Sequence, residues 1–347
     1  MPPRSAPIKC VVWDLDDTLW TGALLEDEQV RLRPEAASVI EALDRRGILQ
    51  SVASRSERDL ALGQLERFGL ADYFISPQIG WSAKSASVRR IAEELQFGAD
   101  AIAFVDDQPL ERDEVSAALP GVLVLDGRRL AELPALPELN PAFVTEDGRR
   151  RRHEYKSNLA RRRDQAAFEG PAETFLASLR VECRIRRALP ADLMRAEELI
   201  ARSRQLNSSE RRYSHQELES LLSSPRHRLL MVDLRDRYGD HGRVGLAIIE
   251  LDERCWWIRL LVVSCRVIAY GIGALLLGHV LRRAAAASVA VGADFVAAQT
   301  NRPLYVTYRL AGFRHFAAPG AAPVLLHDGR PTPAVPSYAT LASDGSL

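Results

Sequence analysis

The segment V-V-W-D-L-D-D-T-L-W-T-G, residues 11–22, decides the fold of the first half of this chain. The apolar run at residues 11–13 predicts a buried strand of a parallel sheet, which places Asp14 at the strand's carboxyl end, where open α/β sheets bind ligands. Asp14 and Asp16 are two residues apart, so an extended backbone directs both carboxylates to one place. A divalent cation is the natural group to hold them together. The segment therefore predicts a metal-assisted phosphoryl site.

Two interpretations of these aspartates follow from the residues. They would suit a turn or a helix N-terminus, where Asp accepts hydrogen bonds from backbone N–H groups. The pattern D-x-D-x-T after an apolar strand also resembles the first motif of the haloacid dehalogenase (HAD) superfamily. That resemblance implies that Asp14 is a nucleophile, that Asp16 is a general acid and base, and that Thr18 is among the phosphate-binding residues.

The composition is that of a two-domain protein. The chain has 347 residues, 47% of them hydrophobic, which is enough for two domains with proper cores. Its 46 Lys and Arg residues balance 46 Asp and Glu residues, which argues against nucleic acid as a partner. The four cysteines lack the spacing of metal sites and the density of secreted scaffolds. With no signal-like N-terminus and no apolar run as long as a membrane span, we expect a soluble, cytoplasmic protein with no membrane partner.

Strands alternate with helices through the first half of the chain. This alternation predicts an α/β fold, a doubly wound parallel sheet over residues 1–140, and the motif resemblance implies that this domain is HAD-like. After the first strand, the expected strands are residues 48–53, 73–75, 101–105 and 122–125. The expected helices are residues 34–46, 57–68, 85–95 and one from Pro109, and residues 23–32 are expected to form a flap or hairpin.

A polar residue of a fitting kind follows each of these strands. Ser54 offers a hydroxyl and Arg55 a guanidinium to phosphate oxygens, and Lys84 offers a cation. Asp106 or Asp107 offers a further metal ligand. Taken singly, Ser54 suits a turn, Lys84 a solvated surface, and the aspartate pair a helix N-cap. Together, in the order of the remaining HAD motifs, they indicate one phosphatase site.

The predicted chemistry is a two-step phosphoryl transfer assisted by Mg2+. The metal ligands would be Asp14, the backbone carbonyl of Asp16, and Asp106 or Asp107. Asp14 would attack phosphorus in line. Asp16 would protonate the leaving oxygen and then activate the water that hydrolyses the aspartyl phosphate.

The middle of the chain predicts a joint between two domains. Residues 130–141 carry three prolines and predict the exit from the first domain. Residues 141–180 predict a basic helical linker, with arginines at 149–152 and 161–163. Such a helix is compatible with a solvated face or with a dock for an acidic partner.

Residues 181–347 predict a second α/β domain with the order β-α-α-β-β-β-α-β-α, which resembles the GNAT acyltransferase fold. The expected strands are residues 181–187, 228–234, 244–251, 256–263 and 289–296, and the expected helices are residues 191–204, 214–222, 271–283 and 303–312. Gly271 and Gly273 open a helix directly after a strand. They resemble that fold's loop for the phosphate or pantetheine arm of an acyl carrier. Such a loop can bind an oxygen-rich ligand because glycine leaves the backbone N–H groups uncovered.

Cys265 lies between that strand and the glycine loop. A thiolate beside Arg266 and near a helix N-terminus would have the electropositive surroundings that activate sulfur, so we expect Cys265 to be a nucleophile. The other three cysteines predict small buried hydrophobes. His279 is a candidate base in the following helix, and a core histidine is the alternative.

Segments in both halves together resemble one family, the FkbH-like proteins. The resemblance runs from about Lys9 to Phe316 and rests on V-V-W-D-L-D-D-T-L-W-T-G, S-V-A-S-R-S, I-G-W-S-A-K-S, F-V-D-D-Q-P-L-E-R-D-E-V, R-Q-L-N, Y-S-H-Q-E-L, D-R-Y-G-D-H-G, S-C-R-V-I-A-Y-G-I-G and N-R-P-L-Y-V-T-Y-R-L-A-G-F. It implies a glyceryltransferase/phosphatase of polyketide antibiotic assembly that uses 1,3-bisphosphoglycerate. The glyceryl group would pass to an enzyme thiol, lose its remaining phosphate at the HAD site, and reach the phosphopantetheine thiol of an acyl carrier protein.

Carried over by position, the resemblance implies that Cys265 is the acyl tether. It implies these residues for the phosphatase step: Asp14, Asp16, Ser54, Lys84 and Asp106 or Asp107. The chain departs from the family pattern at Asp17 and at Arg204, where Asn is common.

Two other functions stay open at this point. One is a HAD phosphatase fused to an N-acyltransferase that uses acyl-CoA, which would need no thioester on Cys265. The other is a non-catalytic assembly scaffold with vestigial sites. The acidic residues retained at the strand ends argue against the scaffold.

Overall fold

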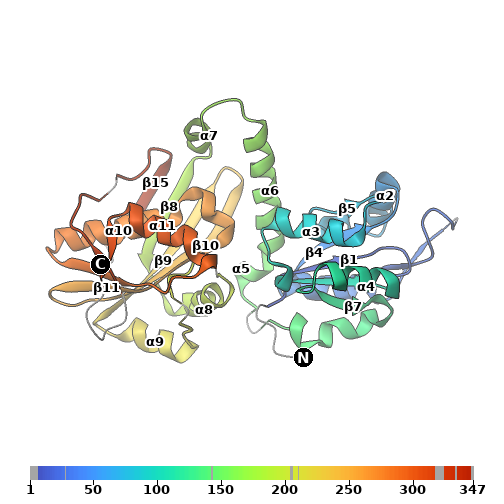
Figure 1. Ribbon diagram of the computed structural model, residues 1–347, viewed down its shortest axis with the longest axis horizontal. Helices are drawn as coiled ribbons and strands as arrows, with labels where there is room; N and C mark the ends of the chain where they lie inside the picture. Colours follow the sequence, from blue (N-terminus) through green and yellow to red (C-terminus); the bar gives the residue numbers. More distant parts are fainter. Residues whose placement is uncertain are drawn as a thin grey trace. The chain divides into compact units, whose positions relative to one another are not determined.

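The computed structural model describes residues 7–27, 29–141, 144–203, 206–209, 211–316, 324–332 and 334–344. The chain forms two compact units, Met1–Lys156 and Ser157–Leu347, called here the N-terminal unit and the C-terminal unit (Figure 1). The division falls within helix α6, Arg151–Ala167, inside the segment where a linker is expected. Arg204, one of the two departures from the FkbH-like pattern, lies outside the described residues.

The sheet of the N-terminal unit has the strand order β5-β4-β1-β6-β7, and every neighbouring pair is parallel. Its strands are β1 Cys10–Trp13, β4 Leu49–Ser54, β5 Gln78–Ile79, β6 Ile102–Asp106 and β7 Leu123–Asp126. The chain first winds from β1 to one edge and then returns to build the other edge from β6. This reversal places the switch point of the sheet, where open α/β sheets bind ligands, at the carboxyl ends of β1 and β6, and it confirms the predicted doubly wound parallel sheet.

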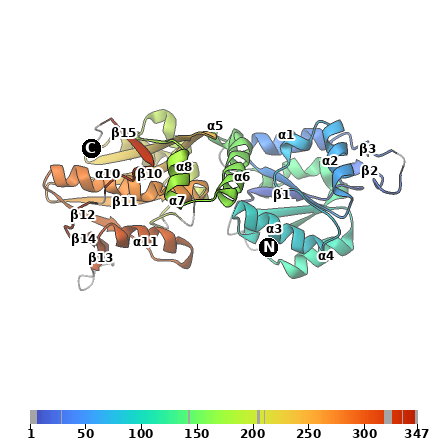
Figure 2. The same ribbon diagram turned by 90° about the horizontal axis from the view of Figure 1, so that it is seen from above.

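Helices cover both faces of this sheet, with α1 and α2 on one face and α3 and α4 on the other (Figure 2). The helical segments are α1 Ala36–Arg45, α2 Arg58–Arg67, η1 Ala71–Tyr73, α3 Lys84–Leu95, η2 Ala99–Ala101, α4 Pro109–Ala118, η3 Gly127–Ala135, η4 Pro137–Leu139 and α5 Glu146–Arg149. A short hairpin, β2 Trp20–Thr21 with β3 Arg31–Leu32, confirms the predicted flap. All four residues of β1 are fully buried, as a central strand covered on both faces requires.

Two local predictions in the N-terminal unit are wrong. The strand expected at residues 73–75 is not formed: η1 ends at Tyr73, Phe74 makes an isolated bridge to Gln50, and the edge strand β5 follows at Gln78–Ile79. Three apolar residues are too few to distinguish a strand from a turn by periodicity. Lys84 does not follow a strand directly, because it is the first residue of α3.

The expectation that the arginines of the basic segment form a solvated face is also wrong for Arg151 and Arg152. Arg151 is 5% exposed and donates to the carbonyl of Gly47 at 2.6 Å. The Arg152 guanidinium donates to Asp44 at 3.0 Å and lies 4.7 Å from the centre of the Tyr73 ring. The start of α6 is therefore held to the N-terminal unit by buried and half-buried arginines. A pattern based on hydrophobicity alone assigns such charged residues to the surface, so it does not predict their burial.

The C-terminal unit contains an eight-stranded sheet in the order β13-β14-β12-β11-β10-β9-β8-β15. Its strands are β8 Val181–Arg187, β9 His227–Asp236, β10 Gly239–Glu250, β11 Cys255–Val263, β12 Ala290–Asp294, β13 Phe313–Phe316, β14 Val324–His327 and β15 Ala339–Ser343. The helical segments are α7 Ala172–Ser178, η5 Pro190–Asp192, α8 Leu193–Arg202, α9 His215–Ser223, η6 Cys265–Tyr270, α10 Ile272–Ala286, η7 Gln299–Asn301 and α11 Arg302–Leu310.

The element order from β8 to α11 confirms the predicted second α/β domain. One apolar core lies between the sheet and helices α10 and α11, and a second lies between the opposite face and helices α8 and α9. Three strands that the sequence analysis did not expect, β13, β14 and β15, extend the sheet at its two edges. None of the helices in the described ranges is both long enough and apolar enough to cross a membrane.

His279 is buried in α10, and its Nε2 has no hydrogen-bond partner among the described residues. Burial, with Arg282 and Arg283 nearby, lowers the pKa of His279 to about 4. In the unfolded chain the His279 imidazole takes up a proton near pH 6.5, whereas in the folded chain it does so only near pH 4. The stability that the neutral side chain contributes is therefore present above pH 6.5 and is lost as the pH falls towards 4.

We expect the free energy of unfolding to fall by about 2 kcal/mol more between pH 7.5 and pH 5 in the wild type than in His279→Leu, as one perturbed histidine predicts. Urea denaturation at the two pH values measures this difference. The exposed His153 provides the control, because His153→Leu should keep the wild-type dependence on pH. Equal losses in wild type and His279→Leu would contradict the assignment.

Candidate active site

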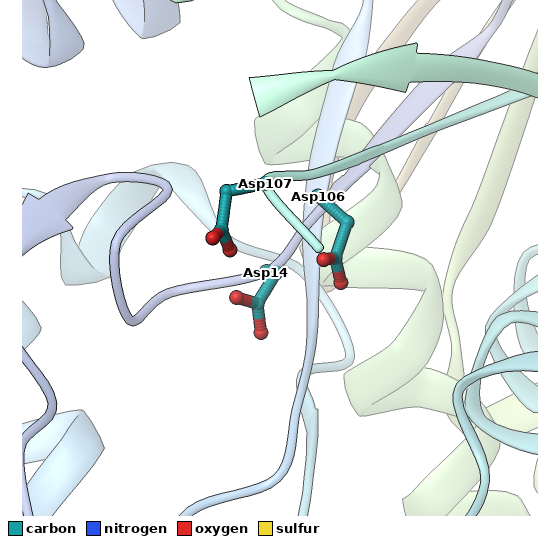
Figure 3. Close-up of side chains that lie close together, drawn as sticks. All are labelled: Asp14, Asp106 and Asp107. Carbon is teal, nitrogen blue, oxygen red and sulfur yellow. The ribbon is translucent and has the colours of Figure 1, made fainter. Parts of the chain in front are cut away.

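Three carboxylates meet at the crevice between β1 and β6 (Figure 3). Asp14 directly follows β1, Asp106 ends β6, and Asp107 is the next residue. The parallel pairing of Trp13 with Val105 brings these strand ends level. One carboxylate oxygen from each of the three aspartates lies within 4.8 Å of the other two. The fold therefore brings Asp14 together with Asp106 and Asp107, which the sequence predicted as site residues from two distant segments.

Thr18 and Gly127 fix the positions of these carboxylates. The Thr18 hydroxyl lies 3.4 Å from an oxygen of Asp14 and 3.4 Å from an oxygen of Asp107, and it accepts a hydrogen bond from the Asp107 N–H at 3.1 Å. A Cβ atom at Gly127 would lie 3.0 Å from Thr18 and 3.1 Å from the backbone of Asp106 and Asp107. Glycine at 127 thus permits the close approach of η3 to the site.

Lys84 lies buried among three carboxylates. Its Nζ contacts Asp14, lies 3.1 Å from Asp106, and lies 2.9 Å from Glu111. Burial disfavours the ammonium form, but these three carboxylates outweigh that effect and raise the pKa of Lys84. Lys84 therefore stays protonated and compensates part of the negative charge.

Glu111 is a site residue that the sequence analysis missed. It lies in the first turn of α4, is 9% exposed, and joins Lys84 to Arg55, whose guanidinium lies 3.0 Å from its carboxylate. The available signal was its position four residues after Asp107, which places the two side chains on one side of a helical turn. Arg55 is held at the site by this pair, and its side chain is 45% exposed.

Ser54 ends β4, the neighbour of β1, and is 3% exposed. Its carbonyl accepts a hydrogen bond from the Gly80 N–H at 3.0 Å, so the backbone of Ser54 helps to position the loop that leads to Lys84. Ser54 therefore lies at the same carboxyl edge of the sheet as Asp14.

The Asp16 carboxylate is directed to the hairpin, outside the three-aspartate cluster. Its Oδ1 accepts hydrogen bonds from the indole of Trp20 at 2.7 Å and from the Leu24 N–H at 3.1 Å. Both bonds fall on Oδ1, and no hydrogen bond to Oδ2 is found among the described residues. Asp17 has φ 52° and accepts from the Gly22 N–H at 2.8 Å. Asn tolerates this left-handed conformation as Asp does, so either residue suits position 17.

The charges at the site fit a divalent cation. Burial raises the pKa of Asp14 to about 7. The charge of Lys84 opposes this shift, and the charge of Asp106 adds to it. Burial and the charge of Asp106 also raise the pKa of Asp107. Four carboxylates share two cationic side chains, so negative charge is in excess. All three oxygens of the cluster are hard ligands, and they lie within 4.8 Å of one another, so one small divalent cation could contact all three. Asp14, Asp106 and Asp107 would hold such an ion.

The candidate residues of the C-terminal unit lie at the junction of β11 and α10. Cys265 is half-buried at the start of η6. Gly271 has φ 64° and caps α10, and a Cβ atom there would lie 3.3 Å from the Tyr338 hydroxyl. Gly273 lies in the first turn of α10, where a Cβ atom would make only ordinary contacts. The left-handed turn is therefore a reason for glycine at 271, and no steric reason requires it at 273.

Comparisons with known proteins give no family. No protein-family model matches the chain, and no curated protein matches its sequence. Among solved structures, the chain is similar to the N-terminal part of protein BF1531 from Bacteroides fragilis, described as containing a phosphatase domain complexed with Mg, with 27% identity and a TM-score of 0.35. The similarity covers 38% of this chain and 41% of the Bacteroides chain, so this chain spans about two fifths of that protein's length.

Two acetyltransferases are also similar. Aminoglycoside acetyltransferase AAC(6')-Ib in complex with coenzyme A has 16% identity and a TM-score of 0.32, with 42% of this chain and 92% of that chain covered. The ribosomal-protein-S18-alanine N-acetyltransferase from Escherichia coli has 16% identity and a TM-score of 0.32, with 42% and 90% covered. These similarities are too weak to assign an activity to either unit. The strand orders define a doubly wound parallel α/β unit followed by a second α/β unit with a mixed eight-stranded sheet.

We expect Lys84→Met to lower the free energy of unfolding by about 3–5 kcal/mol in metal-free buffer at pH 8, because it leaves buried carboxylates uncompensated. Urea denaturation of the full chain measures this loss. Lys156 provides the matched control: it pairs with Asp72, whose side chain is 69% exposed, so Lys156→Met should cost about 1 kcal/mol or less. Equal, small losses in both variants would contradict the role given to Lys84.

Proposed function

We propose that this chain is a glyceryltransferase/phosphatase of polyketide biosynthesis. It takes the glyceryl unit of 1,3-bisphosphoglycerate, removes the remaining phosphate at the N-terminal site with Mg2+ as cofactor, and loads the glyceryl group as a thioester on an acyl carrier protein. The observation that carries the phosphatase half is the cluster of Asp14, Asp106 and Asp107 beside a buried lysine. The resemblance to FkbH-like proteins supports the substrate, the carrier protein and a cytoplasmic location.

The residues of the N-terminal unit divide the phosphatase step between them. Mg2+, when bound, would offset the repulsion between the anionic nucleophile and the anionic phosphate. The Asp14 carboxylate attacks phosphorus, and the Oδ2 proton of Asp16 goes to the leaving oxygen. Asp16 then takes a proton from the water that hydrolyses the aspartyl phosphate. Lys84 and Arg55 offer positive charge to the phosphoryl oxygens.

The transfer step belongs to the C-terminal unit. An acyl phosphate is activated enough to acylate a thiol without a nucleotide, which fits a chain that has no P-loop motif. Cys265 accepts the acyl group as a thioester. The Gly271 N–H donates to the carbonyl of Ile268 at 3.2 Å, so the N–H of Gly273 in the first turn of α10 is the one suited to the phosphate or the amide oxygens of a phosphopantetheine arm.

The experiment that tests this proposal is intact-mass analysis of the chain after incubation with 1,3-bisphosphoglycerate and Mg2+, with and without the phosphopantetheine form of an acyl carrier protein. We expect a glyceryl adduct on the wild-type chain that moves to the carrier. Asp14→Asn should accumulate the phosphoglyceryl adduct instead, because acylation precedes dephosphorylation. Cys265→Ala should carry no adduct.

Two matched variants serve as controls. Asp17→Asn makes the same chemical change three residues from Asp14 and should behave as the wild type, because the Asp17 side chain accepts from Gly22 outside the cluster. Cys255→Ala removes another partly exposed thiol and should keep the adduct.

The other two functions predict different results. An N-acyltransferase that uses acyl-CoA would show no adduct and would keep its activity in Cys265→Ala. A scaffold would show no Mg2+-dependent phosphate release at all. Absence of an adduct from both the chain and the carrier protein would contradict the proposal.

A further inference from the structure

The C-terminal unit contains a buried polar cluster that the proposed reaction has not used. Asp236 ends β9, His241 lies near the start of β10, and Tyr270 ends η6. The three residues are 6%, 1% and 0% exposed, respectively. Burial of an imidazole, a carboxylate and a phenol costs stability unless they are paired, so their arrangement needs an explanation.

The Asp236 carboxylate anchors the other two side chains. Its Oδ1 lies 3.1 Å from His241 Nε2, and its second oxygen accepts a hydrogen bond from the Tyr270 hydroxyl. The rings of His241 and Tyr270 are 5.6 Å apart. Burial raises the pKa of Asp236, but its bonds to His241 and Tyr270 outweigh burial, and the pKa is lowered overall. Asp236 therefore stays ionised.

This arrangement leaves one ring nitrogen of His241 available. An ionised Asp236 beside Nε2 stabilises the tautomer that carries its proton on Nε2, so the lone pair is on Nδ1. Neither buried ring nitrogen of His241 makes a hydrogen bond of full geometry among the described residues; Nε2 faces the Asp236 carboxylate at 3.1 Å, whereas Nδ1 faces no carboxylate within ion-pair distance. An imidazole held by a carboxylate on one nitrogen and open on the other is the arrangement of a positioned general base.

The candidate nucleophile lies on the chain segment beside this histidine. The guanidinium of Arg266 donates to the carbonyl of His241 at 3.2 Å, and the N–H of Ser264 donates to the carbonyl of Val244 at 2.8 Å. These two bonds bracket Cys265 and tie its segment to the part of β10 that carries His241. His279, the base considered from the sequence, is buried within α10 and has a lowered pKa.

We propose that His241, positioned by Asp236, is the general base that activates the Cys265 thiol. This inference rests on the proposed function. The thiol proton moves to Nδ1 of His241, and the sulfur electron pair forms a bond to the acyl carbon while the bond from that carbon to the phosphate oxygen breaks. Phosphate leaves with the electron pair. His241 then releases its proton to water. In the second step it takes the proton of the carrier thiol, the carrier sulfur bonds to the acyl carbon while the bond from that carbon to the Cys265 sulfur breaks, and the proton on His241 passes to the departing Cys265 sulfur.

The neighbouring charges support this exchange. Arg266 on η6 and Asp236 on β9 face His241, and the Arg161 guanidinium of α6 lies 5.0 Å from the centre of the Tyr270 ring. The Asp236 carboxylate, 3.1 Å from His241 Nε2, attracts the positive charge that the imidazole gains when it takes up the thiol proton. Tyr270 keeps Asp236 in place and is a positioning residue, as is Asp236.

The test measures the alkylation rate of Cys265 by iodoacetamide against pH, with the modified peptide quantified by mass spectrometry. We expect His241→Gln to lower the rate at pH 7 by about 10-fold or more, with convergence on the wild-type rate at pH 10, where the thiol ionises without help. Asp236→Asn should lower the rate at pH 7 as well. The exposed His215 provides the control, because His215→Gln should keep the wild-type profile.

Added imidazole separates a chemical role from a structural one. In His241→Gly, imidazole should restore alkylation of Cys265 at pH 7, and it should also restore the glyceryl adduct from 1,3-bisphosphoglycerate. Alkylation profiles that are the same in wild type, His241→Gln and Asp236→Asn would overturn this inference even if glyceryl transfer occurs. A profile that depends on His241 without any glyceryl adduct would support it and contradict the proposed function instead.

Discussion

The buried ammonium group of Lys84 is the interaction on which the N-terminal site depends. Parallel strands bring Asp14 and Asp106 to adjacent positions, where two carboxylates with little access to water repel each other. Lys84 and the arginine paired with Glu111 offset only part of that charge. The remaining excess suits a divalent cation, and the proposed phosphatase step uses that cation beside an anionic phosphate. The excess of negative charge that lowers the stability of the folded chain is therefore also the property that suits the site to a cation.

The C-terminal unit uses a buried carboxylate differently. Asp236 is compensated by neighbours that can share or donate protons, His241 and Tyr270, whereas Asp14 lies beside a second carboxylate, that of Asp106. That arrangement suits proton transfer to and from a thiol, whereas the three-aspartate cluster suits metal-assisted phosphoryl transfer. Two different chemistries in one chain are what a reaction with a thioester stage and a dephosphorylation stage requires.

Sequence patterns predicted the doubly wound sheet well because alternating apolar strands and helices leave strong periodic signals. They also located Asp14, Asp106 and Asp107, since carboxylates at the ends of parallel strands converge by geometry. Glu111 was missed because one acidic residue in the first turn of a helix is common on any surface. His241 was missed because its partners come from β9 and η6, and no local pattern encodes that contact. The strands β13 to β15 were missed because they are short and lie at sheet edges.

The most direct test of the central claim is calorimetric titration of the metal-free chain with Mg2+. The account predicts one binding site per chain in the wild type and in Asp17→Asn, and loss of that site when Asp106 and Asp107 are both changed to Asn. Mg2+ binding that is undiminished in the double variant would contradict the claim that these strand-end carboxylates form the metal centre of the protein.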